Sequence, residues 1–158
     1  MITSRALLLL LLVPVLATGC GSSSPKQAAT PTRLTQAQFV AAANAVCIKS
    51  DKRVFQLGRL SLLPRPWGLT AVAAHEGVLE MSFLQPPAKA EAGFRHLLVL
   101  GRRLETGIQQ VRDALAKKDY RVARDAQVRA TRADTAIHLQ AKKLGLTFCQ
   151  QLLTNWPA

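Results

Sequence analysis

The chain has 158 residues and a formal net charge of +12, with 49% hydrophobic but only 5% aromatic side chains. This length allows one ordinary domain with a real core, and the abundance of Ala, Leu, Arg and Gln favours helix over a β-rich architecture. The positive charge fits an anionic neighbour, such as phospholipid headgroups or an acidic cell-wall polymer.

The first twenty residues combine an early cation, Arg5, with an apolar run that ends before Thr18. A transmembrane helix needs roughly 20 apolar residues, whereas this run covers residues 6–17 and is interrupted by proline. We therefore expect a cleaved export signal rather than a permanent span. The sequence Ala17-Thr18-Gly19-Cys20 resembles the lipobox of bacterial lipoproteins. This resemblance implies cleavage before Cys20 and acylation of its thiol; the alternative is an ordinary cleaved signal followed by an unmodified cysteine.

The lipoprotein resemblance divides the chain into a signal peptide over residues 1–19, a lipid anchor and flexible tether over 20–33, and a helical domain over 34–158. It implies a lipid-anchored position on the extracytoplasmic face of the cell membrane, with palmitate or similar chains on the first residue. Two or three acyl chains would make the anchor stable, because one chain alone binds only marginally. Cleavage would remove one cation and leave 139 residues with a net charge of +11. Nucleic acid is not expected as a partner there.

Two further cysteines, Cys47 and Cys149, remain for the domain. In an oxidising compartment an even pair favours a disulfide. This bond would close a loop of about 100 residues, which the chain-entropy model values at on the order of 4–5 kcal/mol. The alternative is two separate buried thiols. Their wide spacing, with no histidine pattern nearby, argues against a metal site.

The domain is predicted to begin with Thr35 as an N-cap and Gln38 at the capping-box position. Apolar residues recur at helical spacing over 36–57 and place Cys47 on the inner face of a first helix. Residues 58–69 then contain two prolines and two glycines, which predicts a loop packed over the bundle end. The alternative is that its leucines and tryptophan form an exposed patch that contacts a partner.

A second, shorter helix is expected over residues 70–84, with Val72, Leu79 and Phe83 facing inward. The prolines at 86 and 87 end this helix, and Pro87 suits the first turn of the next.

The third helix carries the clearest pattern in the domain, an apolar seam with alternating steps of three and four residues. Its members are Ala90, Phe94, Leu97, Gly101, Leu104, Ile108, Val111 and Leu115. Gly101 has no side chain and would allow a neighbouring helix to approach closely.

A fourth helix is predicted to start after Asp119, its N-cap, and to end before Gly145. Its inner stripe is mostly alanine and consists of Ala123, Ala126, Ala130, Ala133, Ile137 and Leu144. Short links between helices favour antiparallel neighbours. The predicted fold is therefore all-α, an up-down four-helix bundle with one shorter helix. In this arrangement the end of the fourth helix returns beside the first and brings Cys149 near Cys47, so that a disulfide closes the bundle.

No catalytic site is predicted. The three histidines, His75, His96 and His138, lie on different expected helices, and Glu76 and Glu80 form an acid pair typical of solvated surface. The sequence contains no HExxH, no Glu-x-x-His pair, no nucleophile elbow, no phosphate-binding glycine loop and no dinucleotide fingerprint. We therefore expect no enzyme, no metal and no cofactor.

Basic residues are the remaining candidates for function, and eleven of them gather on the third and fourth helices. They are Arg102, Arg103, Arg112, Lys117, Lys118, Arg121, Arg124, Arg129, Arg132, Lys142 and Lys143. At 100° per residue, Arg121, Arg124, Arg132 and Lys143 fall on related outward faces of the fourth helix. The simplest interpretation is a solvated basic face. The functional hypothesis is a surface that lies against anionic lipid or cell-wall polymer.

These observations favour a non-enzymatic envelope protein that binds a protein partner or an anionic polymer through its basic helices. The alternative function is a sensor or small-ligand-binding bundle with a pocket between helices, beside the alanine-rich face and His96 or His138.

The layout as a whole resembles small helical lipoproteins of actinobacteria. The resemblance depends on Cys20, a tether rich in Ser, Pro and Thr, Cys47 in the first helix, and the ending Leu144-Gly145-Leu146-Thr147-Phe148-Cys149. It implies a location and an architecture, and it carries no activity.

Overall fold

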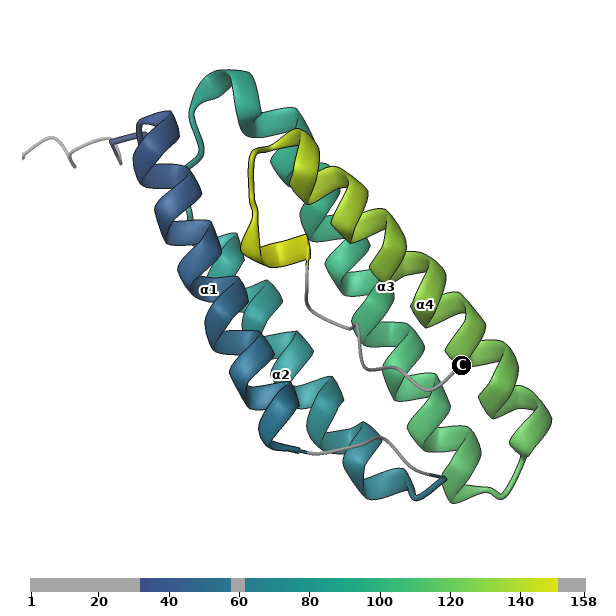
Figure 1. Cartoon of the computed structure of the whole chain (residues 1–158). Helices are drawn as coiled ribbons and strands as arrows, with labels where there is room; N and C mark the ends of the chain where they lie inside the picture. The colour runs from purple at the N-terminus through teal and green to yellow at the C-terminus, as the bar shows by residue number, and fades with distance from the viewer. Residues whose placement is uncertain (1–31, 58–61, 151–158) are drawn as a thin grey trace, which may run out of the picture. The chain divides into compact units, whose positions relative to one another are not determined.

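The computed structural model describes residues 32–57 and 62–150, and within them the fold is all-α. Four long helices, α1 (Gln36–Gln56), α2 (Pro64–Ser82), α3 (Glu91–Ala116) and α4 (Tyr120–Lys143), alternate in direction along the chain (Figure 1). Two short 3₁₀ turns, η1 (Ala88–Ala90) and η2 (Phe148–Gln150), complete the described elements. The predicted up-down four-helix bundle is confirmed, and α2 is the shortest of its helices at 19 residues. The predicted signal peptide, Cys20 and most of the tether lie outside the described residues.

The helix ends follow the capping chemistry that the sequence predicted. The Thr35 side chain accepts a hydrogen bond from the Gln38 N–H, and the Gln38 side chain accepts one from the Thr35 N–H. Asp119 caps α4 by accepting from the Val122 N–H at 3.1 Å. Helix α4 ends in a Schellman motif, with Gly145 at φ 76° and the Leu146 N–H donating to the Ala141 carbonyl at 2.9 Å.

Helix α3 ends in the same motif, although no glycine marks the position. Lys118 adopts the left-handed conformation at φ 57°, and the Asp119 N–H donates to the Ala114 carbonyl at 2.9 Å. Asp119 therefore ends one helix and caps the next, which makes the α3–α4 link short.

The seams of α3 and α4 form the centre of the core, as predicted. The buried residues of α3 are Phe94, Leu97, Leu100, Leu104, Gly107, Ile108, Val111, Ala114 and Leu115. They pack against the alanine stripe of α4, whose members Ala126 and Ala130 are fully buried. Glycines mark close approaches between helices. For example, a Cβ at Gly107 would lie 3.1 Å from the Ala130 Cα, and one at Gly101 would lie 2.8 Å from Val78 Cγ2.

Helix α2 begins earlier than predicted, so the expected loop over residues 58–69 is wrong from residue 64 onward. Pro64 occupies the first helical turn, where a missing N–H costs nothing. Trp67 is buried as expected, but from within the helix. The proline pair that appeared to be a loop signal is a helix start.

The predicted inner face of α2 is also wrong. Val72, Leu79 and Phe83 are 55%, 47% and 73% exposed, while Ala71 and Met81 are buried. Helix α2 is apolar on both faces, so its periodicity does not distinguish the side that enters the core. The face that enters the core carries Trp67, Ala71 and Met81, and α2 packs against both α1 and α3.

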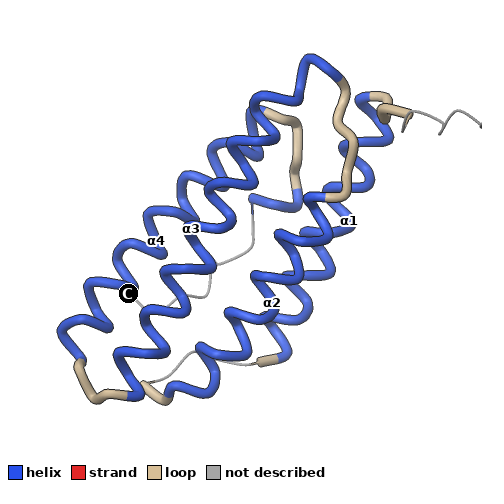
Figure 2. The backbone as a smooth tube through the Cα atoms, turned by 180° about the vertical axis from the view of Figure 1, so that it is seen from behind, coloured by secondary structure: helices blue, strands red, loops and turns tan. Residues whose placement is uncertain are grey.

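One side of the bundle is closed by the C-terminal segment rather than by helix contact. Within the described residues, α1 packs on α2, α2 on α3 and α3 on α4, whereas α1 and α4 make no direct backbone contact. The turn η2 contacts both of them, and it lies between α1 and α4 (Figure 1; Figure 2 shows the bundle from behind). The Phe148 N–H donates to Asn44 Oδ1 at 3.2 Å.

A disulfide joins Cys47 to Cys149, with their Cα atoms 5.1 Å apart. Both residues are buried, and the Cα separation falls in the usual range for disulfides. The predicted pair is therefore confirmed, and it covalently attaches the closing segment to α1.

Removal of the disulfide is expected to lower the free energy of unfolding by on the order of 4–5 kcal/mol, because the closed loop spans 102 positions. Urea denaturation of the oxidised protein and of a Cys47→Ala, Cys149→Ala double variant would measure the difference. A loss below about 1 kcal/mol would contradict a stabilising role.

Because Phe94 is buried and Phe83 is exposed, replacement by alanine should lower the free energy of unfolding much more at Phe94 than at Phe83. Phe94 is 3% exposed and packs edge-to-face on Phe39, with ring centroids 5.2 Å apart. Phe94→Ala should cost about 3–5 kcal/mol, whereas Phe83→Ala should cost about 0.5 kcal/mol or less. Urea denaturation of both variants would test this, and similar losses would mean that α2 is rotated from the described position.

Candidate anion-binding groove

A groove of about 630 Å³ lies between the outer sides of α3 and α4. Seven residues of α3 and four of α4 line it: Val99, Leu100, Arg102, Arg103, Thr106, Gly107, Gln110, Arg129, Arg132, Ala133 and Ala136. The floor is apolar and small, and the rims carry four arginines.

Helical spacing explains why these residues share one groove. On each helix they recur every three or four positions, so they form a stripe directly beside the core-facing stripe. The close approach of Gly107 to Ala130 brings the two backbones together. The arginines of both helices therefore border the same depression.

The four groove arginines, Arg102, Arg103, Arg129 and Arg132, are exposed. Within the described part of the chain, none of them forms an ion pair within 4.0 Å. Arg129 donates to Gln110 Oε1 at 3.0 Å across the groove. This hydrogen bond holds one guanidinium in place and leaves its charge uncompensated.

Acidic residues near the groove do not neutralise it. Asp113 lies one turn beyond Gln110 on α3 and pairs with Arg112 at 2.7 Å. Asp125 lies one turn before Arg129 on α4, and it does not line the groove.

Two cations on the opposite side of the bundle form ion pairs. Lys49 contacts Glu80 at 2.7 Å and Arg53 contacts Glu76 at 2.5 Å, both between α1 and α2. The hydrogen bond from Lys49 is the main cause that lowers the pKa of Glu80 below its usual value. Glu76 and Glu80 are thus paired between α1 and α2, whereas the four groove arginines of α3 and α4 form no ion pair with any described residue.

The predicted surface residues Arg121, Arg124, Arg132 and Lys143 are all exposed on α4. Arg132 lines the groove, and the other three do not. The sequence analysis named Arg102, Arg103 and Arg129 among the basic residues of these helices but did not include them in the predicted surface. The available signal was the recurrence of arginines beside the apolar seam on both helices.

The histidines occupy three different environments. His75 contacts Glu105 at 3.0 Å, and His96 is exposed. His138 lies 3.4 Å from Asp134, which is buried although it is charged. Burial raises the pKa of Asp134 to about 6, and the neighbouring His138 acts in the opposite direction. Neither Asp134 Oδ1 nor His138 Nε2 has a hydrogen-bond partner among the described residues.

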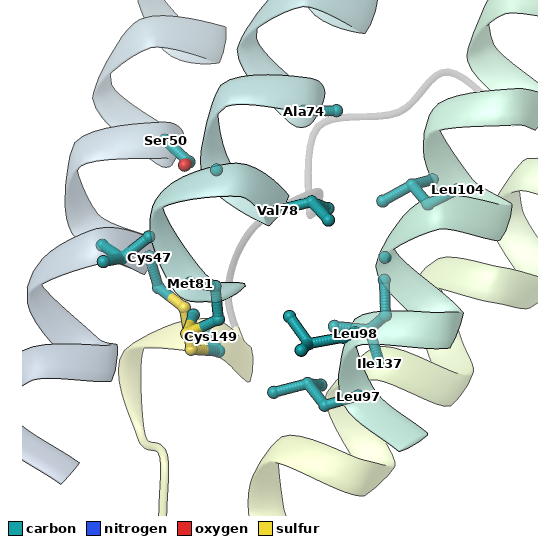
Figure 3. Close-up of a pocket in the computed structure, with 13 residues that line it drawn as sticks. Cys47, Ser50, Ala74, Val78, Met81, Leu97, Leu98, Leu104, Ile137 and Cys149 are labelled. Carbon is teal, nitrogen blue, oxygen red and sulfur yellow. A yellow bond between two sulfur atoms is a disulfide. The ribbon is translucent and has the colours of Figure 1, made fainter. Parts of the chain in front are cut away.

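A second, smaller hollow of about 100 Å³ opens into the core beside the disulfide (Figure 3). Its lining is almost entirely apolar and comes mainly from α1, α2 and α3. Ile137 is its single residue from α4, and neither His96 nor His138 lines it. The pocket therefore differs in position from the one expected beside the alanine-rich face of α4.

The described residues contain no group of three or more His, Cys, Asp or Glu side chains that could hold a metal ion. None of the helices in the described ranges is long and apolar enough to cross a membrane. Comparison with protein families, curated proteins and solved structures finds no match to this chain.

Asp134 predicts a dependence of stability on pH. Its pKa in the folded protein, about 6, exceeds the unfolded value of about 3.9. Between these values the folded state holds a proton that the unfolded state has lost, so stability falls as pH rises. From about pH 5 to pH 7 the expected loss is about 1 kcal/mol.

Urea denaturation of the wild-type protein and of Asp134→Asn at the two pH values would measure this effect. The variant should lack that loss, because an amide does not titrate. Equal losses in both proteins would assign the pH dependence to another group.

Proposed function

We propose that this chain is a lipid-anchored, extracytoplasmic and non-enzymatic protein that binds an anionic partner of the cell envelope through α3 and α4. The observation that carries the proposal is the groove between these helices, whose four exposed arginines lack acidic partners in the described structure. Unpaired guanidinium groups attract phosphate or carboxylate, which they bind bidentately.

The anchor rests on the sequence from Arg5 to Cys20, and the disulfide supports the location. Disulfides persist in oxidising compartments outside the cytoplasm, and both residues of the Cys47–Cys149 bond are buried. A coil-like tether over residues 20–33 would hold the domain about 20 Å from the membrane anchor. At this distance the domain reaches both headgroups and polymers that lie along the membrane.

The composition of the groove favours binding over catalysis. Its polar residues are arginines, Thr106 and Gln110. Arginine stays protonated at every physiological pH and therefore serves poorly as a general acid or base. The function that fits this chemistry is electrostatic recognition.

The alternative, a small-ligand-binding or sensor bundle, would use the apolar hollow beside the disulfide. That hollow has about 100 Å³, whereas an apolar cavity of about 150 Å³ takes a ligand of benzene size. The larger, charged groove therefore supports anion binding better.

Two measurements on protein from membranes test the proposal. Intact mass should correspond to a chain that starts at acylated Cys20, with Cys47 and Cys149 alkylated only after reduction. Binding to anionic vesicles or to cell-wall material should weaken steeply as salt rises, because screening shortens the range of exposed charges. An unlipidated chain would contradict the anchor, and binding that ignores ionic strength would contradict the electrostatic function.

A further inference from the structure

We infer that the groove and the outward face of α4 form one docking surface for an anionic phospholipid membrane, with a headgroup phosphate seated between the groove arginines. The inference rests on the proposed function and specifies its partner. Two features of the surface carry it: the arrangement of the arginines, and exposed apolar side chains beside them.

The first feature is that arginines approach the groove from both helices. Arg102 and Arg103 are neighbours on α3. Arg129 and Arg132 are about one helical turn apart on α4. A phosphate in the groove therefore meets guanidinium donors from both sides. The rim supplies charge-assisted hydrogen bonds, and the small apolar floor leaves room for the bound group.

The second feature is an apolar component on the outward face of α4. Val128, Arg132 and Leu139 are separated by four and seven residues, so they share this face of the helix. Val128 is 44% exposed and Leu139 is 61% exposed. On the α3 side, Val99 lines the groove and is 46% exposed.

This mixture of arginines and exposed aliphatic side chains favours a bilayer over a soluble polymer. A helix that lies on a membrane places cations among the headgroups and apolar side chains at the boundary with the acyl chains. A wall polymer would use the charge but would offer nothing to cover Val128 and Leu139. Charge complementarity and the apolar residues thus indicate the same partner.

The inference is tested with the mature chain, residues 20–158, carrying Cys20→Ser so that no lipid contributes to binding. Every described helix lies within this range. Cosedimentation is measured with vesicles of neutral phospholipid alone and with vesicles that contain about 30% anionic phospholipid, at an ionic strength of about 0.1 M, where the screening length is about 10 Å.

The groove variant carries Arg103→Gln with Arg129→Gln. Its matched control carries Lys52→Gln with Arg65→Gln, which removes the same charge from exposed positions on α1 and α2. Binding to anionic vesicles should weaken about tenfold or more in the groove variant and about threefold or less in the control. Equal weakening in the two variants would overturn the groove as a specific binding site, because the loss of binding would then follow from net charge alone.

A third variant, Val128→Ser with Leu139→Ser, tests the apolar component without changing charge. Its binding to anionic vesicles should weaken several-fold. Unchanged binding would overturn the inference that Val128 and Leu139 insert at the boundary between headgroups and acyl chains. Far-UV circular dichroism and urea denaturation of all variants would show that the exposed substitutions leave the fold intact.

Two further arms separate this inference from the proposed function. Millimolar glycerol 3-phosphate should compete with vesicles more strongly than chloride at equal ionic strength; equal effects would overturn a discrete phosphate site. Wild-type protein that binds wall material tightly but anionic vesicles weakly would overturn the membrane partner and keep the proposed function. Wild-type protein that binds neither would overturn both.

Discussion

The bond between Cys47 and Cys149 defines this bundle, because it closes the one side where two helices do not meet. Helices α1 and α4 make no direct backbone contact in the described chain, and η2 contacts both. The chain leaves α4 through Gly145, buries Leu146 and turns back to place Cys149 against α1. A covalent link across 102 positions strongly reduces the conformational entropy of the unfolded chain. It also fixes the closing segment, which by itself has only one short turn of helix.

The distribution of charge follows from this packing. Helix α2 lies between α1 and α3, and its Glu76 and Glu80 pair with cations of α1. These two carboxylates are therefore used on that side. The four groove arginines form no ion pair with any described residue, and Gln110 orients Arg129. Part of the net charge of +12 is therefore concentrated at one place, the groove between α3 and α4. A localised positive surface can discriminate between binding partners by their charge.

The success of each prediction depended on how one-sided the pattern was. The seam of α3 has polar residues on its other face, so its spacing alone identified Phe94, Leu97 and Ile108 as core. Helix α2 is apolar on two faces, and its spacing selected the wrong one. Local chemistry at helix ends was predictable where a specific residue signals it, as Thr35 and Gly145 do. The left-handed turn at Lys118 has no such signal.

The sequence by itself determined that there are four long helices, their up-down order and the cysteine pair, although it did not locate the start of α2. These features depend on local capping, on apolar spacing and on short links. It also determined that the surface is basic. Tertiary structure alone decided which face of α2 enters the core and that η2 closes the bundle. It also decided which arginines of α3 and α4 border the same groove. The groove requires Arg103 of α3 and Arg129 of α4 to border one depression. The physical reason is that helical period fixes neighbours within a helix, whereas neighbours between helices depend on how closely small residues such as Gly107 and Ala130 let the backbones approach.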